Sequence, residues 1–213
     1  MGFKSKLEQL SIKVKKKLDN SPRCHDWEHT NRVIHNARVL ASKEEGVDNK
    51  VIELGALLHD IARADELAIK GKLCHAKRGA EIAGEILKDA GFDKVMSEKV
   101  VKCVRRHRFR GNQMPVSIEE KIVYDADKLD SVGAVGIGRS FLFAGREGAK
   151  LHNTEKEALS SSSYSINDTA YREYLVKQRN IPAKMQTVTG KAIAQKRVKF
   201  MKVFFDKLDE EVY

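Results

Sequence analysis

The sequence lacks the features that mark membrane and secreted proteins. No hydrophobic run approaches the roughly 18 consecutive apolar residues of a membrane span. Residues 3–18 alternate Lys with Leu, Ile and Val instead of forming the apolar core of a signal peptide. We therefore expect no membrane segment and a cytoplasmic location.

Cysteine is scarce, because Cys24, Cys74 and Cys103 are the only three in 213 residues. Their odd number, wide spacing and lack of a Cys-x-x-Cys pair argue against a disulfide framework and against a thiolate zinc site. We expect these thiols to be reduced and mostly buried.

Aromatic residues make up only 7% of the chain, and neither an RNA-binding Lys/Arg-Gly-Phe motif nor zinc-finger spacing occurs. Stacking platforms for nucleic-acid bases are therefore few, which makes nucleic acid the less favoured partner. The formal net charge of +10 nevertheless suits an anion, with a solvated lysine-rich surface as the alternative. Phosphates are the first anions to consider.

Runs of Val, Ile and Thr that would mark a sheet are also missing, and hydrophobic residues recur every three or four positions. This pattern predicts an all-α fold, and the length suits one compact domain over residues 1–213. The predicted helices are Phe3–Leu18, Asp26–Glu45, Asn49–Ile61, His75–Ala90, Asp93–Arg106, Ile118–Leu129, Val132–Glu147, Asp168–Lys177 and Pro182–Glu210.

Glycines and one polar segment separate these helices. Gly46, Gly91 and Gly111 fall where helices should end. The segment 148–167 includes a run of four serines and is predicted to be a loop, either a cover over a site or a plain surface loop.

The pair His59-Asp60 interrupts an apolar segment that starts at Val51 and continues into Ile61 and Ala62. A carboxylate in such a segment costs several kcal/mol unless it is neutralised, and a bound cation beside a neutral imidazole would neutralise it. The dipeptide alone is weak evidence, because it also occurs at His25-Asp26.

Other polar residues lie in register with hydrophobic positions of their helices. His29 is in register with Val33, Ala37 and Leu40, His75 with Gly79, Ile82 and Ile86, and His107 with Val100, Cys103 and Val104. Asp127 follows Val123 by four residues, and Asp130 follows three residues later. We expect these side chains to point inward.

A single inward histidine is more often a hydrogen-bonded core residue than a ligand. Five or six such residues would each need a partner, whereas one divalent cation can satisfy imidazole nitrogens and carboxylates together. A shared metal is therefore the simplest interpretation. We expect His25 either to hydrogen-bond to a metal ligand or to cap the start of its helix, without binding the metal itself. We expect His35 and His152 to be surface or loop residues.

The order His29, His59-Asp60 and Asp127 on helices resembles the HD superfamily of metal-dependent phosphohydrolases. The flanking residues match too, in His29-Thr30-Asn31-Arg32-Val33, Leu57-Leu58-His59-Asp60-Ile61 and Asp125-Ala126-Asp127-Lys128-Leu129-Asp130. His75 followed by Gly79-Ala80, and then His107, also resemble family motifs. The resemblance covers about residues 24–130, which leaves 131–213 as a helical C-terminal extension.

This resemblance implies a compact all-α HD-type fold with the metal between core helices. It implies His29, His59, Asp60 and Asp127 as metal ligands, and His75 and His107 as ligands of a second ion in members that hold two. Whether this chain holds one ion or two stays open. No Gly-Tyr-Pro signature occurs, and the chain is most similar to the small stand-alone microbial HD hydrolases.

The mixed nitrogen and oxygen ligands suit Mn, Fe, Co, Ni or Zn, with Mg a less natural choice. The leading hypothesis is a phosphomonoesterase or phosphodiesterase whose metal-bound hydroxide attacks a nucleotide or similar small phosphate ester. Arg32 and Lys128 would meet the developing charge, with Arg106 and Arg139 as weaker candidates. Asp130 could orient water or transfer a proton, and His75 and His107 could bind phosphate instead of metal. The alternatives are a di-iron HD-type oxygenase and a non-catalytic phosphate- or nucleotide-binding regulatory module.

Overall fold

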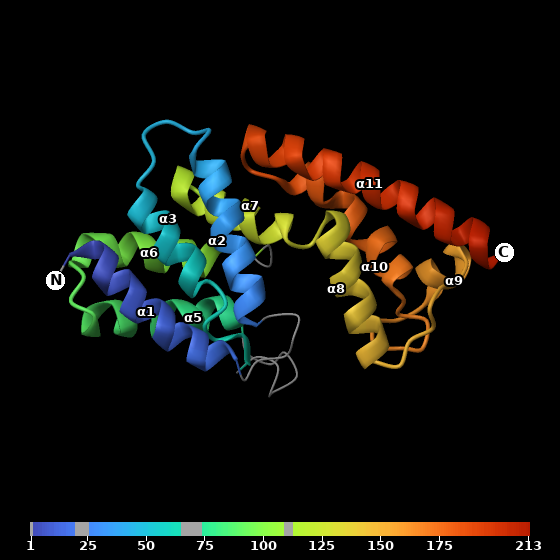
Figure 1. Cartoon of the computed structure of the whole chain (residues 1–213), viewed down its shortest axis with the longest axis horizontal. Helices are drawn as coiled ribbons and strands as arrows, with labels where there is room; N and C mark the ends of the chain where they lie inside the picture. The colour runs from blue at the N-terminus through green and yellow to red at the C-terminus, as the bar shows by residue number, and fades with distance from the viewer. Residues whose placement is uncertain (1, 20–25, 65–73, 109–112) are drawn as a thin grey trace. The chain divides into compact units, whose positions relative to one another are not determined.

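A computed structural model describes residues 2–19, 26–64, 74–108 and 113–213. Every long regular element in these ranges is a helix, which confirms the all-α prediction (Figure 1). The helices are α1 Phe3–Leu18, α2 Trp27–Ala41, α3 Asn49–Leu58, α5 His75–Asp89, α6 Lys94–Arg106, α7 Ile118–Leu129, α8 Gly133–Arg146, α9 Glu155–Ser160, α10 Ala170–Val176, η1 Gln178–Lys184 and α11 Val188–Val212. None of them is both long and apolar enough to cross a membrane.

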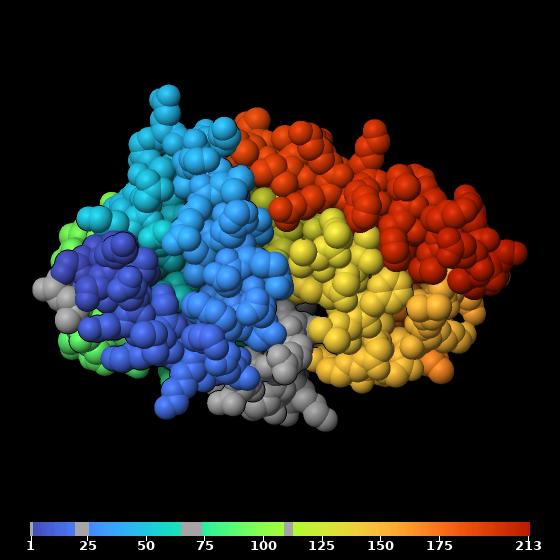
Figure 2. Space-filling model, viewed as in Figure 1, coloured from blue at the N-terminus to red at the C-terminus, as the bar shows by residue number. Residues whose placement is uncertain are grey.

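The chain divides into two compact units, Met1–Asp127 and Lys128–Tyr213. Figure 2 shows α1 and α2 at the surface of the first unit, and α8 and α11 at the surface of the second. The prediction of one domain over residues 1–213 stays a prediction.

Local capping chemistry sets the helix ends. Asp26 begins α2 by accepting a hydrogen bond from the backbone N–H of His29 at 3.1 Å, and Asp93 begins α6 in the same way. At the end of α5, Gly91 has φ +69°, and the amide of Phe92 donates to the carbonyl of Leu87 at 3.0 Å. Gly46 also has positive φ, as expected for a helix end, whereas Gly111 lies outside the described residues.

The core of the first unit surrounds α3, where seven of ten residues are buried. Buried side chains of α1, α5, α6 and α7 pack with α3 in one apolar cluster, which includes Leu10, Leu54, Leu87 and Val104. The buried helix ends at Leu58, so His59 and Asp60 emerge in the interior rather than at the surface.

An aromatic cluster forms much of the core of the second unit. Phe205 of α11 is buried and lies 4.9 Å from the ring of Tyr174, 5.5 Å from Tyr171 and 6.4 Å from Phe141, measured between centroids. These contacts join α8, α10 and α11 within this unit.

The prediction of a loop over residues 148–167 was wrong in part, because α9 forms inside it. Thr154 and Glu157 form a capping box, in which the Thr154 hydroxyl accepts from the Glu157 amide and the Glu157 carboxylate accepts from the Thr154 amide. This reciprocal pair supports a helix too short to show a hydrophobic period.

The expectation of mostly buried cysteines holds for one of the two thiols described. Cys103 is buried against α3, whereas Cys74 is exposed just before α5. Cys24 lies outside the described residues.

Candidate metal centre

His59 and Asp60 lie in the interior of the first unit, as the apolar segment around them predicts. His59 is fully buried and Asp60 is 4% exposed. Burying a carboxylate to this degree requires compensating partners. Side chains from two groups of possible metal ligands lie near the Asp60 carboxylate and provide such partners.

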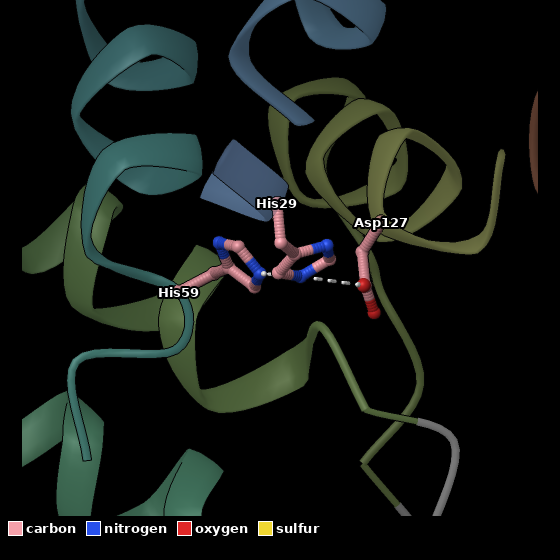
Figure 3. A group of neighbouring side chains, drawn as sticks. All are labelled: His29, His59 and Asp127. Carbon is pink, nitrogen blue, oxygen red and sulfur yellow. Dashed lines mark hydrogen bonds and ion pairs between the residues drawn. The ribbon is translucent and has the colours of Figure 1, made fainter. Parts of the chain in front are cut away.

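The first group consists of His29, His59 and Asp127 (Figure 3). The Nε2 atoms of the two histidines lie 3.1 Å apart, and His29 Nε2 lies 3.6 Å from Asp127 Oδ1. These residues come from α2, the end of α3 and α7. Three segments that are distant in sequence thus point ligand atoms at one place, which gives the predicted residues a common site.

The second group consists of Asp60, His75 and His107. His75 Nε2 lies 3.2 Å from Asp60 Oδ1 and 3.1 Å from His107 Nε2. All three side chains are buried. The histidines predicted to lie on inward faces of α5 and at the end of α6 therefore do face the interior.

Asp60 joins the two groups through its two oxygens. Oδ2 lies 3.6 Å from His29 Nε2 and 3.8 Å from His59 Nε2, while Oδ1 faces His75 and His107. One carboxylate thus contacts ligand atoms on both sides. These contacts give the buried carboxylate of Asp60 polar partners on both sides.

His59 has the protonation pattern of a metal ligand. Its Nδ1 lies 2.7 Å from the carbonyl oxygen of Ala56, which can only accept, so Nδ1 carries the proton and Nε2 keeps a lone pair. Burial lowers the pKa of His59 from its usual value, although the charges of Asp60 and Asp127 act in the opposite direction. The imidazole is therefore neutral, as metal binding requires.

The donor atoms of the first group fit a divalent transition metal. Imidazole nitrogens bind zinc at about 2.0–2.1 Å, so two of them at roughly right angles about one ion lie about 3 Å apart. The observed separation between His29 and His59 is 3.1 Å. Two imidazoles with the carboxylates of Asp60 and Asp127 make a mixed nitrogen and oxygen set, which suits Mn, Fe, Co, Ni or Zn better than Mg.

Two arginines that the sequence did not single out contact the second group. Arg63 Nη1 lies 3.0 Å and Arg108 Nη1 lies 3.1 Å from His75 Nδ1. Arg63 is one turn after Asp60 and Arg108 directly follows His107, so proximity to motif residues was the available signal. Their convergence on His75 depends on the tertiary fold.

Two other basic residues of the first unit, Arg32 and Arg106, were predicted to meet charge on the substrate. Arg32 is half-buried on α2, one turn after His29. Arg106 donates to both carboxylate oxygens of Glu120, at 3.1 and 2.8 Å, and Glu120 is buried. Arg106 therefore ties α6 to α7, which gives it a structural role.

The remaining candidates belong to the second unit. Asp130 is buried and accepts a hydrogen bond from Arg139 Nη1 at 2.9 Å. Arg139 thus pairs with another predicted site residue. Lys128 is half-buried near the end of α7.

The histidines not predicted as ligands had mixed outcomes. His35 is exposed, as expected, and His25 lies outside the described residues. His152 lies in a loop as expected, but it is buried rather than exposed, with Nε2 3.1 Å from Asp209 Oδ1. Its ring packs against Tyr171 and Tyr213, which are distant in sequence and so leave no local signal.

Comparisons with known proteins agree with this geometry. The sequence profile of the HD domain matches residues 26–132, which include both ligand groups. An uncharacterized protein of Bacillus subtilis, YpgQ, is 31% identical over 211 residues, which cover 96% of this chain and 93% of YpgQ.

Solved structures extend the similarity to the whole fold. The crystal structure of YpgQ has a TM-score of 0.77 at 28% identity and covers 100% of this chain and 98% of its own. YpgQ in complex with ADP has a TM-score of 0.73, also at 28% identity, over 99% and 97% of the two chains. A predicted HD superfamily hydrolase from an uncultured Thermotogales bacterium has a TM-score of 0.69 at 30% identity, over 97% and 93%.

Proposed function

The chain belongs to the HD-domain family, and from this premise we propose that it is a metal-dependent phosphohydrolase acting on a nucleotide or a similar small phosphate ester. The observation that carries the proposal is the buried convergence of His29, His59, Asp60 and Asp127. Two buried imidazoles and two carboxylates are a donor set that can hold a hydrolytic metal, and a bound cation would offset the cost of burying the carboxylates.

The choice of a nucleotide-like substrate rests on two observations. YpgQ, which shares the fold over nearly its whole length, was crystallised with ADP. The net charge of +10 favours an anionic ligand. Both support a phosphate-bearing small molecule over a neutral one.

A divalent ion at the first group would lower the pKa of its bound water toward about 7, which would supply hydroxide at neutral pH. The two imidazoles and two carboxylates would hold that ion. The Ala56 carbonyl orients His59 so that Nε2 faces the site, and the buried surroundings strengthen each electrostatic interaction.

Three further residues have proposed roles with the substrate. Arg32 would stabilise charge on the phosphoryl oxygens, as would Lys128 next to Asp127. Asp130 would orient water, transfer a proton or accept from a sugar hydroxyl. Its bond to Arg139 would hold the carboxylate in place.

The experiment combines metal content with hydrolysis. We would measure bound metals in the full-length protein, then screen ADP, other nucleotides and simple phosphate esters with the wild type and with Asp60→Ala. We expect the substitution to remove the metal. It should also lower kcat/KM by more than roughly 100-fold, which is the largest loss usually seen when a residue that only hydrogen-bonds to a metal ligand is replaced. Asp89→Ala, at an exposed carboxylate ending α5, is the matched control and should change neither quantity.

The outcomes separate the proposal from its alternatives. A wild type that binds no transition metal, with hydrolysis unchanged in Asp60→Ala, would show the proposal to be wrong. Iron with a redox-active spectrum and no hydrolysis would favour the oxygenase. Metal or phosphate binding without turnover of any substrate would favour the regulatory module.

A further inference from the structure

Asn36 is a polar residue on the buried face of α2. Only 6% of it is exposed, and it lies three residues after Val33 and four residues before Leu40, which are both fully buried. Burying a side-chain amide is costly unless its polar atoms are hydrogen-bonded. The partner of this amide therefore indicates what the residue does.

The side-chain amide of Asn36 donates to the backbone of α7. Its Nδ2 atom lies 3.2 Å from the carbonyl oxygen of Ala126, a residue that is fully buried. A carbonyl oxygen only accepts, so the side-chain atom that faces it must be the NH2 group. The bond thus joins α2 to α7 at the residue directly before Asp127.

Asp127 lies in a part of α7 where such support matters. It belongs to the last turn of the helix, which ends at Leu129, and helix ends fray more readily than helix centres. The side chain of Asp127 is 17% exposed, whereas the side chain of His29 is fully buried. Burial therefore holds Asp127 less firmly than it holds the histidine that it faces.

Both His29 and Asn36 belong to α2, and each contacts the last turn of α7. His29 Nε2 lies 3.6 Å from Asp127 Oδ1 (Figure 3), and Asn36 bonds to Ala126. The seven residues between His29 and Asn36 correspond to about 10 Å along a helix, and this spacing puts both on nearly the same face. The backbone next to Asp127 is thus tied to the helix that supplies His29.

We propose that Asn36 is a positioning residue of the metal centre, and that it holds Asp127 at the distance from His29 that a shared ion requires. Asn36 is not itself a ligand in this inference. It acts through the backbone of Ala126, because its bond ends on a carbonyl oxygen and not on the carboxylate. The inference rests on the proposed function for the presence of an ion at the first group.

The first test measures Zn²⁺ affinity by competition against a chromophoric chelator, with the full chain. Zn²⁺ is the probe because nitrogen and oxygen sites hold it more tightly than Mn²⁺, which keeps weakened binding measurable. Asn36→Leu keeps a branched side chain but removes the donor. It should weaken Zn²⁺ binding about 10- to 100-fold, as loss of a residue behind a metal ligand usually does. Unchanged affinity would overturn the proposal.

Asn153→Leu is the matched control. Asn153 Nδ2 also donates to a backbone carbonyl, that of Asn167 at 3.1 Å, but in the second unit. Its replacement removes the same kind of bond, so its Zn²⁺ affinity should stay close to that of the wild type. If Asn36→Leu does not fold, Asn36→Ala removes the same donor without adding bulk and is measured in its place.

A double-variant cycle separates positioning from a general loosening of the fold. If Asn36 acts through Asp127, replacing Asn36 should cost little further Zn²⁺ affinity in a chain that already carries Asp127→Ala, because the carboxylate to be positioned is gone. A merely structural role would add its full effect to that of Asp127→Ala. Such additivity would overturn the proposal.

The visible absorption of bound Co²⁺ is the spectroscopic test, because it depends on the number and geometry of the ligands. At saturating Co²⁺, the spectrum of Asn36→Leu should shift from that of the wild type toward that of Asp127→Ala. The spectrum of Asn153→Leu should match the wild type. A wild-type spectrum in Asn36→Leu would show that Asp127 needs no such support, and the inference would be wrong.

Failure here is distinguishable from failure of the proposed function. If Asn36 and Asp127 are coupled in metal binding but no phosphate ester is hydrolysed, the inference stands and the proposed hydrolysis is wrong. If an ester is hydrolysed and Asn36→Leu binds metal as the wild type does, the proposed function stands and this inference is wrong.

Discussion

At the scale of single residues, Asp60 shows how burial and function are linked. Its two oxygens face four histidine nitrogens, at 3.2 to 3.8 Å, in a unit with a large apolar core cluster. A residue chosen for stability alone would not be a carboxylate here, because apolar replacements of buried charges are often neutral or stabilising. Under the proposed function, this charge helps to hold the metal ion.

Cysteine reactivity offers a prediction at the same scale. Burial, with the charges of Glu120 and Glu119, raises the pKa of the Cys103 thiol well above its usual range, so little thiolate forms at neutral pH. Cys74 is exposed and should be alkylated by iodoacetamide in the native protein. Peptide mapping by mass spectrometry should find Cys103 unmodified until the protein is unfolded.

The pH dependence of that labelling has a definite sign. A thiol reacts through its thiolate, so a raised pKa suppresses the reaction until the pH is correspondingly higher. Since burial raises the pKa of Cys103, its labelling should stay negligible from neutral to mildly alkaline pH. Native-state labelling of Cys103 at a rate similar to Cys74 would contradict its burial.

At the scale of elements, close packing against α3 sets the position of His59-Asp60. Gly55 of α3 faces α6 and α7 so closely that an added Cβ would lie 3.0 Å from Cys103 Cβ and 3.1 Å from Val123 Cγ2. Both neighbours are fully buried and have no room to move away. The glycine permits these helices to approach, and thereby places the end of α3 beside the residues from other helices.

Gly55→Ala should therefore destabilise the protein, with Gly84→Ala of α5 as its matched control. Overpacking costs about 1–3 kcal/mol, more than alanine gains over glycine in a helix. At Gly84 an added Cβ meets only Val101 Cγ2, at 3.5 Å, so helix propensity should stabilise by about 0.5–1 kcal/mol. Urea unfolding measures both, and equal effects of the two substitutions would refute the argument.

At the scale of the whole molecule, the ligand groups connect elements that are far apart in the chain. The first group joins α2, the end of α3 and α7. The second group joins the end of α3, the start of α5 and the end of α6. All six residues belong to the unit Met1–Asp127. A bound ion would thus link helices across this unit and stabilise its folded state.

Metal removal should lower the thermal stability of the chain. A ligand present at 100 times its Kd stabilises by about 2.7 kcal/mol, which corresponds to about 5–10 °C in Tm for a chain of this size. We expect EDTA to lower the Tm of the metal-loaded wild type by that amount in scanning calorimetry. His29→Gln is the control, since a variant that does not load metal should be insensitive to EDTA.

Much of the helical architecture could be predicted because its signals are local. The hydrophobic period predicted α1 and α7 with the bounds observed, and the starts of α2 and α6 within one residue. Where the signal was weak, prediction failed, as at α9, whose six residues depend on one capping box. The buried position of His152 was missed because its neighbours come from α10 and the C-terminus.

The sequence by itself determined which residues of the long helices in the first unit face inward, because helical periodicity is a local property of the chain. It thereby supplied all six residues of the two groups: His29, His59, Asp60, His75, His107 and Asp127. Only the tertiary structure decided how they divide, with Asp60 between the groups, and that Arg63 and Arg108 converge on His75. Such convergence arises from packing of helices that are distant in sequence, which no local pattern encodes.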